Sequence, residues 1–183
     1  MVKKMKRYVA LLRGINVGGK NKLVMTELKK EMTILGFTEV VTYLNSGNLI
    51  FSSDLEDKKT ISTMISNGIK HSFQLDIPVY IALQEDLREL LEHTPDWWDN
   101  GNKDIYDNLI FILPPLFSKK LYEELGEPNA AYEKVFSYKE TIFWSFIRKE
   151  HQKTNWWSRT ARSNVKDSIT IRTANTVKKI ATL

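Results

Sequence analysis

The sequence predicts an α/β (α+β) protein built of two tandem ferredoxin-like βαββαβ units with antiparallel sheets, a linker helix and a C-terminal helix. Its 183 residues suffice for one domain or two small ones. Hydrophobic residues make up 42% and charged residues 27%, as in an ordinary soluble globular protein. The order of apolar runs and helical periodicities, β-α-β-β-α-β, occurs twice. We therefore expect units at residues 1–83 and 107–183, joined by a linker helix and a Trp-Trp segment at residues 84–106.

The first unit begins with a short apolar run that is followed by glycine, which indicates a buried strand. Met25, Leu28, Met32 and Leu35 then recur at helical spacing, and Gly36 follows as a stop signal. Two β-rich runs flank a polar hairpin turn, a second helical pattern follows, and a further strand ends the unit. The expected elements are strands at Tyr8–Arg13, Glu39–Leu44, Leu49–Ser52 and Pro78–Leu83, and helices around Met25–Leu35 and Ile61–Phe73.

Two details of these strands predict where they lie in the sheet. Pro78 has no N–H to give to a neighbouring strand, so the strand that it starts is expected at an edge. In Tyr8–Arg13 both alternating sets of side chains are largely apolar, and the strand around Ile50 is similar. A sheet with one face in water would alternate apolar and polar residues, so both faces are expected to be covered.

The second unit repeats the order after a linker whose leucines, Leu83 to Leu91, indicate a helix. Pro114-Pro115 ends its first strand, and Gly126 ends its first helix. The expected elements are strands at Asn108–Leu113, Glu133–Tyr138, Thr141–Ile147 and Ser168–Arg172, and helices around Phe117–Leu125, Asn155–Asn164 and Val177–Ala181.

Positive and negative residues are unevenly distributed along the chain, and the net charge of +5 is the sum over basic and acidic segments. Each of the segments 1–30, 31–147 and 148–183 carries nine Lys/Arg residues. The same segments carry one, nineteen and two carboxylate residues, respectively. The three segments therefore have net charges of +8, −10 and +7. Two basic ends that met in space would attract a phosphate-bearing ligand or nucleic acid. Alternatively, the basic ends pair with the acidic middle.

Composition and motifs exclude several classes of function. The absence of cysteine excludes disulfides, cysteine-zinc sites, iron–sulfur clusters and thiol catalysis. The three histidines, His71, His93 and His151, are far apart in sequence, so no metal site is expected. Neither the P-loop nor the dinucleotide-binding glycine spacing is present, and no cofactor is expected. The apolar run after the basic N-terminus stops at Arg13, too short for a signal peptide or a membrane helix. A cytoplasmic protein with no membrane association is the expectation.

The segment Arg13-Gly14-Ile15-Asn16-Val17-Gly18-Gly19-Lys20 is the strongest candidate for a ligand site. Three glycines within six positions permit left-handed backbone conformations and leave N–H groups exposed. Such a stretch before a helix can form an anion-binding nest. Arg13 and Lys20 bracket it, and no carboxylate occurs before Glu27. The alternative is a glycine-rich structural turn. We select Arg13, Gly14, Asn16, Gly18, Gly19 and Lys20 as candidate ligand-binding residues.

Topology is expected to place the hairpin turn Asn45-Ser46-Gly47-Asn48 beside this loop. In a split βαβ unit the strand order is 4-1-3-2, so the first two strands point the same way. The end of the first strand and the hairpin then share one edge of the sheet. Asn45, Ser46 and Asn48 could donate to a ligand there, or could simply serve the turn, to which Asn and Gly are suited.

The basic C-terminal region holds further candidates. Arg159, Arg162 and Lys166 follow Trp156 and Trp157. Aromatic side chains beside Arg and Lys could stack on nucleic-acid bases, whereas the usual role of tryptophan is in a core or an interface. Arg172, between the last strand and the last helix, is included among the candidate ligand-binding residues, although a structural role is equally open.

Several of these motifs resemble a known family. Four segments are similar to the bacterial family called domain of unknown function 1697: YVALLRGINVGGK at Tyr8–Lys20, the helix that begins at Met25 with Leu28 and ends in Gly36-Phe37, TYLNSGN at Thr42–Asn48, and Ile171–Val177. The family usually has Asn and Trp where this chain has Thr173 and Ala174. The resemblance implies a pair of ferredoxin-like α/β domains and no established activity.

Three hypotheses of function remain open on these observations. The first is a binding module for a phosphorylated ligand, a nucleotide or nucleic acid, at the glycine-rich basic loop. The second is an enzyme acting on an anionic small molecule, although neither motif supplies an acid or base and no catalytic residue is apparent. The third is a non-catalytic protein-interaction protein with tryptophan anchors such as Trp97 and Trp98. The oligomeric state is not predicted.

Overall fold

The structure, a computed structural model, describes residues 3–183, which form two compact units. The first unit runs through Arg88 and also contains Lys179–Leu183, and the second comprises Glu89–Lys178. Both boundaries therefore fall inside helices, α3 (Gln84–Leu91) and α6 (Ala174–Ile180), rather than at the ends of the expected linker. Among the described residues, no helix has the length and apolar character needed to cross a membrane.

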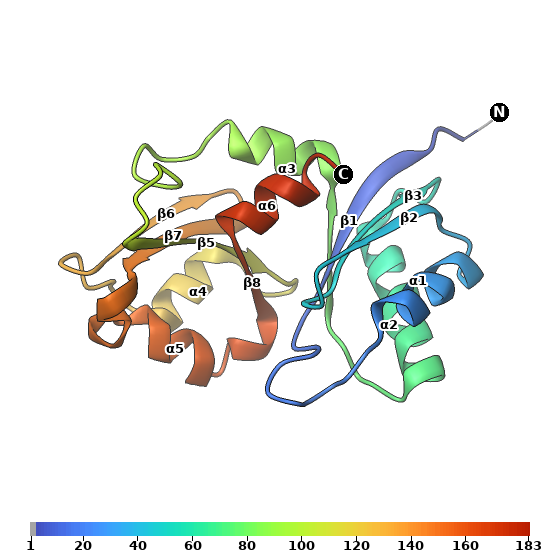
Figure 1. Ribbon diagram of the computed structural model, residues 1–183, viewed down its shortest axis with the longest axis horizontal. Coiled ribbons are helices and arrows are strands. Elements are labelled where there is room, and N and C mark those ends of the chain that lie inside the picture. Colours follow the sequence, from blue (N-terminus) through green and yellow to red (C-terminus); the bar gives the residue numbers. More distant parts are fainter. Residues whose placement is uncertain (1–2) are drawn as a thin grey trace. The chain divides into compact units, whose positions relative to one another are not determined.

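The first unit has the expected β-α-β-β-α-β order (Figure 1). Its elements are β1 (Lys6–Leu12), α1 (Met25–Ile34), β2 (Thr38–Tyr43), β3 (Asn48–Ser53), α2 (Lys58–Phe73) and β4 (Val79–Leu83). The antiparallel sheet has the order β2-β3-β1-β4, as predicted for a split βαβ unit. The edge position expected from Pro78 is confirmed, because β4 pairs only with β1 in this sheet of the described chain.

Both faces of the central strands of this sheet are buried, as the apolar pattern predicts. Tyr8, Ala10 and Leu12 join the core on the side of α1 and α2. Val9 and Leu11, which point to the opposite face, are fully buried as well. The hydroxyl of Tyr8 donates to the carbonyl of Leu55, so the polar end of this core side chain is satisfied.

Residues 179–183 belong to the first unit because two side chains of α3 bind their carbonyl groups. Nε2 of Gln84, a buried side chain, donates to the carbonyls of Ile180 and Leu183 at 2.9 and 2.6 Å. The guanidinium of Arg88 donates to Ala181 at 3.2 Å. These bonds satisfy carbonyls at the end of α6, which have no partner within the helix.

The second unit repeats the topology with additional short helices. Its elements are β5 (Ile105–Ile112), α4 (Ser118–Leu125), β6 (Glu133–Tyr138), β7 (Thr141–Ile147), η1 (Arg148–Lys153), α5 (Trp156–Arg162), η2 (Lys166–Ser168) and β8 (Ile169–Thr173). The sheet order is β6-β7-β5-β8, and every pair is antiparallel. Two tandem ferredoxin-like units are thus confirmed, and α5 is shorter than the expected Asn155–Asn164 helix.

A buried carboxylate attaches α5 to the sheet of the second unit. Glu133, 3% exposed, accepts from the backbone N–H groups of Asn129 and Asn155 and from the indole of Trp144. The indole of Trp156 donates to the carbonyl of Gly126 at the end of α4. Helix α5 is therefore held in place at its first turn, against both the sheet and α4.

Candidate functional site

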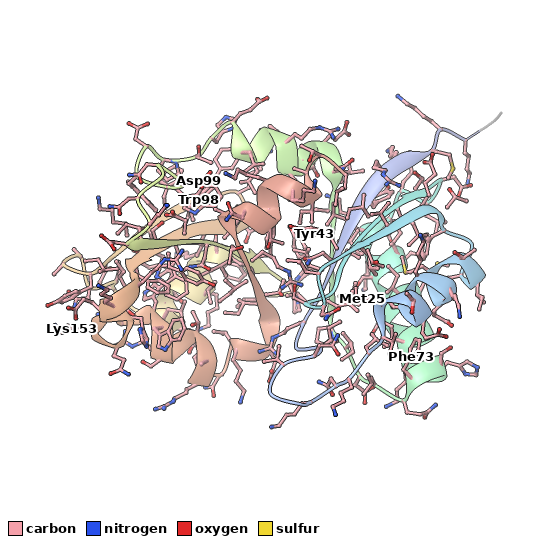
Figure 2. All side chains as sticks on the ribbon, in the orientation of Figure 1. Met25, Tyr43, Phe73, Trp98, Asp99 and Lys153 are labelled. Carbon is pink, nitrogen blue, oxygen red and sulfur yellow. The ribbon has the colours of Figure 1, made fainter. Side chains whose placement is uncertain are left out.

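The glycine loop and the hairpin turn lie side by side at one edge of the first sheet, as the topology predicts. The N–H of Leu12, the last residue of β1, donates to the carbonyl of Gly47 at 2.8 Å. Nδ2 of Asn16 donates to the carbonyl of Asn45 at 2.8 Å. Figure 2 marks Tyr43, at the end of β2, and Met25, at the start of α1, in the elements that flank these two loops.

The side chain of Asn16 fixes the conformation of the glycine loop rather than facing a ligand. Its Oδ1 accepts from the N–H of Leu23, and its Nδ2 donates to the carbonyls of Leu23 and Asn45. Its backbone has a φ of +54°, a region in which asparagine is enriched. Asn21, which the motif analysis missed, adds a bond from its amide to the carbonyl of Gly14. The loop is thus held in a fixed conformation by the side-chain amides of Asn16 and Asn21.

The tip of the loop presents two backbone N–H groups to solvent. A turn closes between Val17 and Lys20, whose N–H donates to Val17 at 3.0 Å. Gly18 and Gly19 occupy its central positions with φ values of +57° and +75°, which glycine adopts without strain. Both are exposed, and within residues 3–183 neither N–H has an acceptor. These two donors are available to an anion.

The charge around this tip is positive and locally uncompensated. Lys20 and Lys22 are exposed, and neither forms an ion pair with a carboxylate in the described part of the chain. Glu27, the next carboxylate along the chain, is paired with Lys30 at 2.8 Å. Arg13 is partly buried at the start of the loop, where its backbone N–H donates to the carbonyl of Pro78. The segment that carries the glycine turn therefore has two exposed lysines and no local carboxylate to neutralise them.

The hairpin residues serve mainly the turn. Asn48 belongs to β3 and is fully buried, and its Nδ2 donates to the carbonyl of Tyr43 and to the hydroxyl of Ser46. Leu44, expected as the end of a strand, lies in the turn with a φ of +57°. Asn45 and Ser46 are exposed, so among the hairpin residues these two side chains have access to a ligand.

Gly47 is the point at which the hairpin touches the glycine loop. A Cβ at this position would lie 2.7 Å from Cδ1 of Ile15 and 2.8 Å from Cβ of Leu12. Both distances are shorter than any ordinary carbon–carbon contact. The close approach therefore requires a residue without a side chain at position 47. The glycine at this position of the hairpin is the sequence signal that could have identified Gly47 as a contact residue.

Arg172 belongs to the second unit, whereas the other nine candidate residues belong to the first. It is 7% exposed, and its guanidinium donates to Oγ1 of Thr170 and to the carbonyl of Ile171. Burial lowers the pKa of Arg172 to about 10, so the side chain stays cationic at neutral pH. Its bonds are those of a residue that supports the backbone of β8.

The tryptophans differ in their surroundings. Trp98, labelled in Figure 2, is buried; its indole N–H donates to the carbonyl of Asn108, and its ring packs edge-on against Phe143. Trp156 is fully buried, which agrees with its expected core role. Trp157 is 44% exposed and Trp97 is partly buried. The exposed tryptophan of this group is therefore Trp157, on α5.

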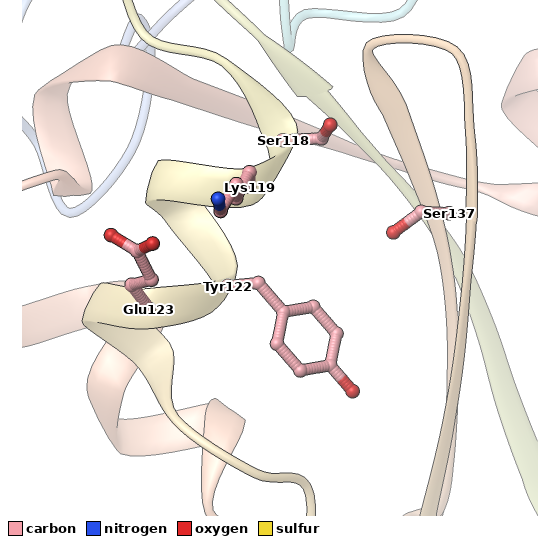
Figure 3. Close-up of a pocket in the computed structure, with 5 residues that line it drawn as sticks. All are labelled: Ser118, Lys119, Tyr122, Glu123 and Ser137. Atoms are coloured by element: carbon pink, nitrogen blue, oxygen red, sulfur yellow. The ribbon is translucent and has the colours of Figure 1, made fainter.

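One shallow pocket of about 340 Å³ lies beside α4 (Figure 3). The ring of Tyr122 points into the space between α4 and the strand that carries Ser137, while Lys119 and Glu123 lie on the same helix. Burial raises the pKa of Tyr122. Within residues 3–183, no group of three or more histidine, aspartate or glutamate side chains could hold a metal ion.

Comparisons with known proteins agree with this architecture. The sequence profile of the family described as "Protein of unknown function (DUF1697)" matches residues 5–143. Among solved structures, the conserved bacterial protein SP0830 from Streptococcus pneumoniae is similar, with a TM-score of 0.85 and 31% sequence identity. The match covers 97% of this chain and 98% of that one. No curated protein matches.

Proposed function

The chain belongs to the DUF1697 family, and from that starting point we propose that its first unit is a binding module for a phosphorylated ligand, a nucleotide or nucleic acid, at the glycine loop. The observation that carries the proposal is the pair of exposed N–H groups at Gly18 and Gly19, in a loop held rigid by Asn16. Consecutive backbone donors in this arrangement bind phosphate oxygens. Lys20 and Lys22 supply the positive charge.

The proposal is tested by titrating inorganic pyrophosphate and labelled single-stranded and duplex oligonucleotides into the protein at several salt concentrations. Each phosphate contact made by a lysine contributes a slope of about −0.9 on duplex DNA, or about −0.7 on single strands, to the plot of log K against log salt. Lys20→Gln should therefore weaken binding and reduce the slope by about one such contact. Absence of salt-sensitive binding at low salt overturns the proposal.

The matched control is Lys29→Gln. Lys29 is an exposed residue of α1, and its substitution removes the same single charge at a site away from the glycine turn. A local site predicts that Lys29→Gln keeps the slope of the wild type. Equal slopes for the two variants would mean that only the net charge matters, and the loop would lose its assigned role.

A protein-interaction role is the second candidate, and exposed apolar side chains on the same two loops favour it. Val17 and Val24 are 64% and 63% exposed, and Leu44 is 53% exposed. Sedimentation of the wild type and of a Val17→Ser/Leu44→Ser variant tests self-association through these side chains. A concentration-dependent mass in the wild type that the variant loses supports this role. Identical monomeric behaviour excludes it for copies of this chain.

A further inference from the structure

A second pocket, of about 370 Å³, lies wholly within the second unit, with α5 on one side and strands β5, β7 and β8 on the other. Its volume lies within the range of about 300–1,000 Å³ that is usual for small-molecule sites. The lining residues come from positions between 106 and 173, so no short motif in the sequence marks the site.

The walls of this pocket are aromatic. Phe146 contacts three other aromatic lining residues, with its ring centroid 5.4 Å from that of Tyr106, 4.8 Å from that of Trp144 and 5.5 Å from that of Trp157. The Phe146 ring meets that of Tyr106 at 62° and that of Trp157 at 69°. Trp157 is 44% exposed, so part of its face is free of protein contacts. Phe146 and Trp144 are buried, so Trp157 is the ring of this cluster that offers a flat face on which a planar ligand can stack.

Two buried polar residues, Asn108 and Thr160, line this aromatic pocket, and the hydroxyl of Thr160 already donates to the carbonyl of Trp156. Asn108, 3% exposed, pairs across the strands with Trp144 and Thr173. Its Nδ2 donates to the carbonyl of Tyr106 at 3.3 Å, a long bond, and its Oδ1 accepts no hydrogen bond from any residue of the described chain. Asn108 lines the pocket and this oxygen has no protein donor among residues 3–183, whereas most polar groups of folded proteins have a hydrogen-bond partner. A ligand with an N–H donor would satisfy it.

A cation lies beside the pocket. The guanidinium carbon of Arg148 lies 4.6 Å from the centroid of the Tyr106 ring, and its Nε donates to the carbonyl of Ile105. Arg148 is exposed and forms no ion pair with a carboxylate among residues 3–183. The ring of His151 packs edge-on against Trp157, 4.8 Å away. The positive charge at this side suits a ligand whose planar ring carries an anionic group.

We propose that the aromatic pocket of the second unit binds the base of a nucleotide that carries an exocyclic amino group, such as adenine. The base stacks on Trp157, its amino group donates to Oδ1 of Asn108, and its phosphate lies toward Arg148. Paired amide and adenine groups are a common recognition pattern. The proposal does not depend on the glycine loop, because adenosine without phosphate is also expected to bind.

Calorimetric titration with adenosine 5′-monophosphate tests the proposal. Purine riboside 5′-monophosphate, which lacks the amino group, should bind about tenfold more weakly to the wild type. Asn108→Leu should remove this preference, because the variant has no acceptor for the amino group. Trp157→Ala should weaken binding of both nucleotides about tenfold. Phe117→Ala is the matched control, since Phe117 is an exposed aromatic residue of the same unit outside the pocket, and it should leave binding unchanged.

Nuclear magnetic resonance gives a second readout that needs no variant. In the wild type, adenosine 5′-monophosphate should shift the indole N–H signals of Trp144 and Trp157 and leave that of Trp97 in place. No saturable binding, a shift confined to Trp97, or equal binding of the two nucleotides overturns the proposal. Comparing adenosine 5′-monophosphate with a short oligo(dA) distinguishes the source of the base. Stronger binding of the nucleotide indicates a free ligand, and stronger binding of the oligomer indicates a single strand.

Discussion

At the scale of single residues, the contact between the glycine loop and the hairpin depends on what Gly47 lacks. Its φ is +86°, and any Cβ would be forced against Ile15 and Leu12. Asn16 instead contributes a side chain, and both the donor and the acceptor atom of its amide form hydrogen bonds with backbone groups of the two loops or of Leu23. One residue permits the close approach and the other fixes it.

The substitution Gly47→Ala is therefore expected to lower the free energy of unfolding by about 2–4 kcal/mol, from backbone strain and overpacking together. Chemical denaturation measures the effect. Gly14→Ala is the matched control, because Gly14 also has a positive φ, +71°, but a Cβ there would contact nothing within 4 Å. It should cost about 1 kcal/mol, from strain alone. Equal costs for the two substitutions would contradict the steric explanation.

Much of this site could be predicted from the sequence, and the limits are physical. The glycine positions and the strand order placed the loop beside the hairpin, which the bonds from Leu12 and Asn16 confirm. The bonding partner of a side-chain amide cannot be derived from residue type. Asn16 and Asn48 offer the same donor and acceptor atoms whether they bind the backbone or a ligand. The pocket at Asn108 was missed because its residues are distant in sequence.

At the scale of elements, the short helix α5 depends on Glu133 for its position. The carboxylate of Glu133 accepts from two backbone N–H groups and from the indole of Trp144. The backbone N–H of Trp156 adds a longer hydrogen bond, of 3.4 Å, to the same carboxylate. A helix of seven residues has little stability of its own, so its packing and these bonds determine its place.

Glu133→Gln should destabilise the second unit by about 2 kcal/mol or more, because the neutral amide turns an N–H₂ group toward donors and loses the charge-assisted bonds. The free energy of unfolding and the near-ultraviolet circular dichroism of the tryptophans provide the measurement. Glu124→Gln, on the exposed side of α4, serves as the control. A wild-type stability for Glu133→Gln would show that α5 is held by apolar packing alone.

A second element-scale contact gives a pH dependence. Glu89 in α3 binds Lys139 at 2.5 Å and the hydroxyl of Tyr138 at 2.8 Å, and these partners lower its pKa below the ordinary value of 4.5. A carboxyl group whose pKa is lower in the folded state stabilises the fold above the unfolded pKa. That contribution disappears as the pH falls through the folded pKa.

Thermal unfolding of Glu89→Gln should therefore show a lower midpoint than the wild type at neutral pH. The difference should shrink as the pH falls below 4.5, where the wild-type carboxyl also becomes protonated. The contact is solvent-exposed and salt-sensitive, so added salt should reduce the difference too. A difference that stays constant down to acidic pH would show that the charge of Glu89 is not the cause.

At the scale of the whole molecule, the basic segments of the chain belong to different units. Of the two basic segments, residues 3–30 lie in the first unit and most of residues 148–183 in the second. Each unit thus has its own positive region, with the glycine turn in one and Arg148 beside the aromatic pocket in the other. The two proposed sites can therefore be tested independently of each other.

Removal of residues 179–183 is expected to destabilise the first unit, although these residues lie farthest from it in the sequence. The truncation leaves Gln84, 4% exposed, without the carbonyls of Ile180 and Leu183, and an unsatisfied buried amide costs about 1–3 kcal/mol. Hydrogen exchange measures the effect, and lost protection should appear in β1 and β4. Unchanged protection there would mean that these bonds do not contribute to the stability of the unit.

The same five residues impose an order on biosynthesis. A ribosome releases the first unit's own sheet early, yet the partners of Gln84 and Arg88 are not available until translation has passed Leu183. The second unit, all of whose residues precede Lys179, is then complete before the first. The first unit should therefore reach its full stability only after residues 179–183 have left the ribosome, even though domains generally fold from the N-terminus onward.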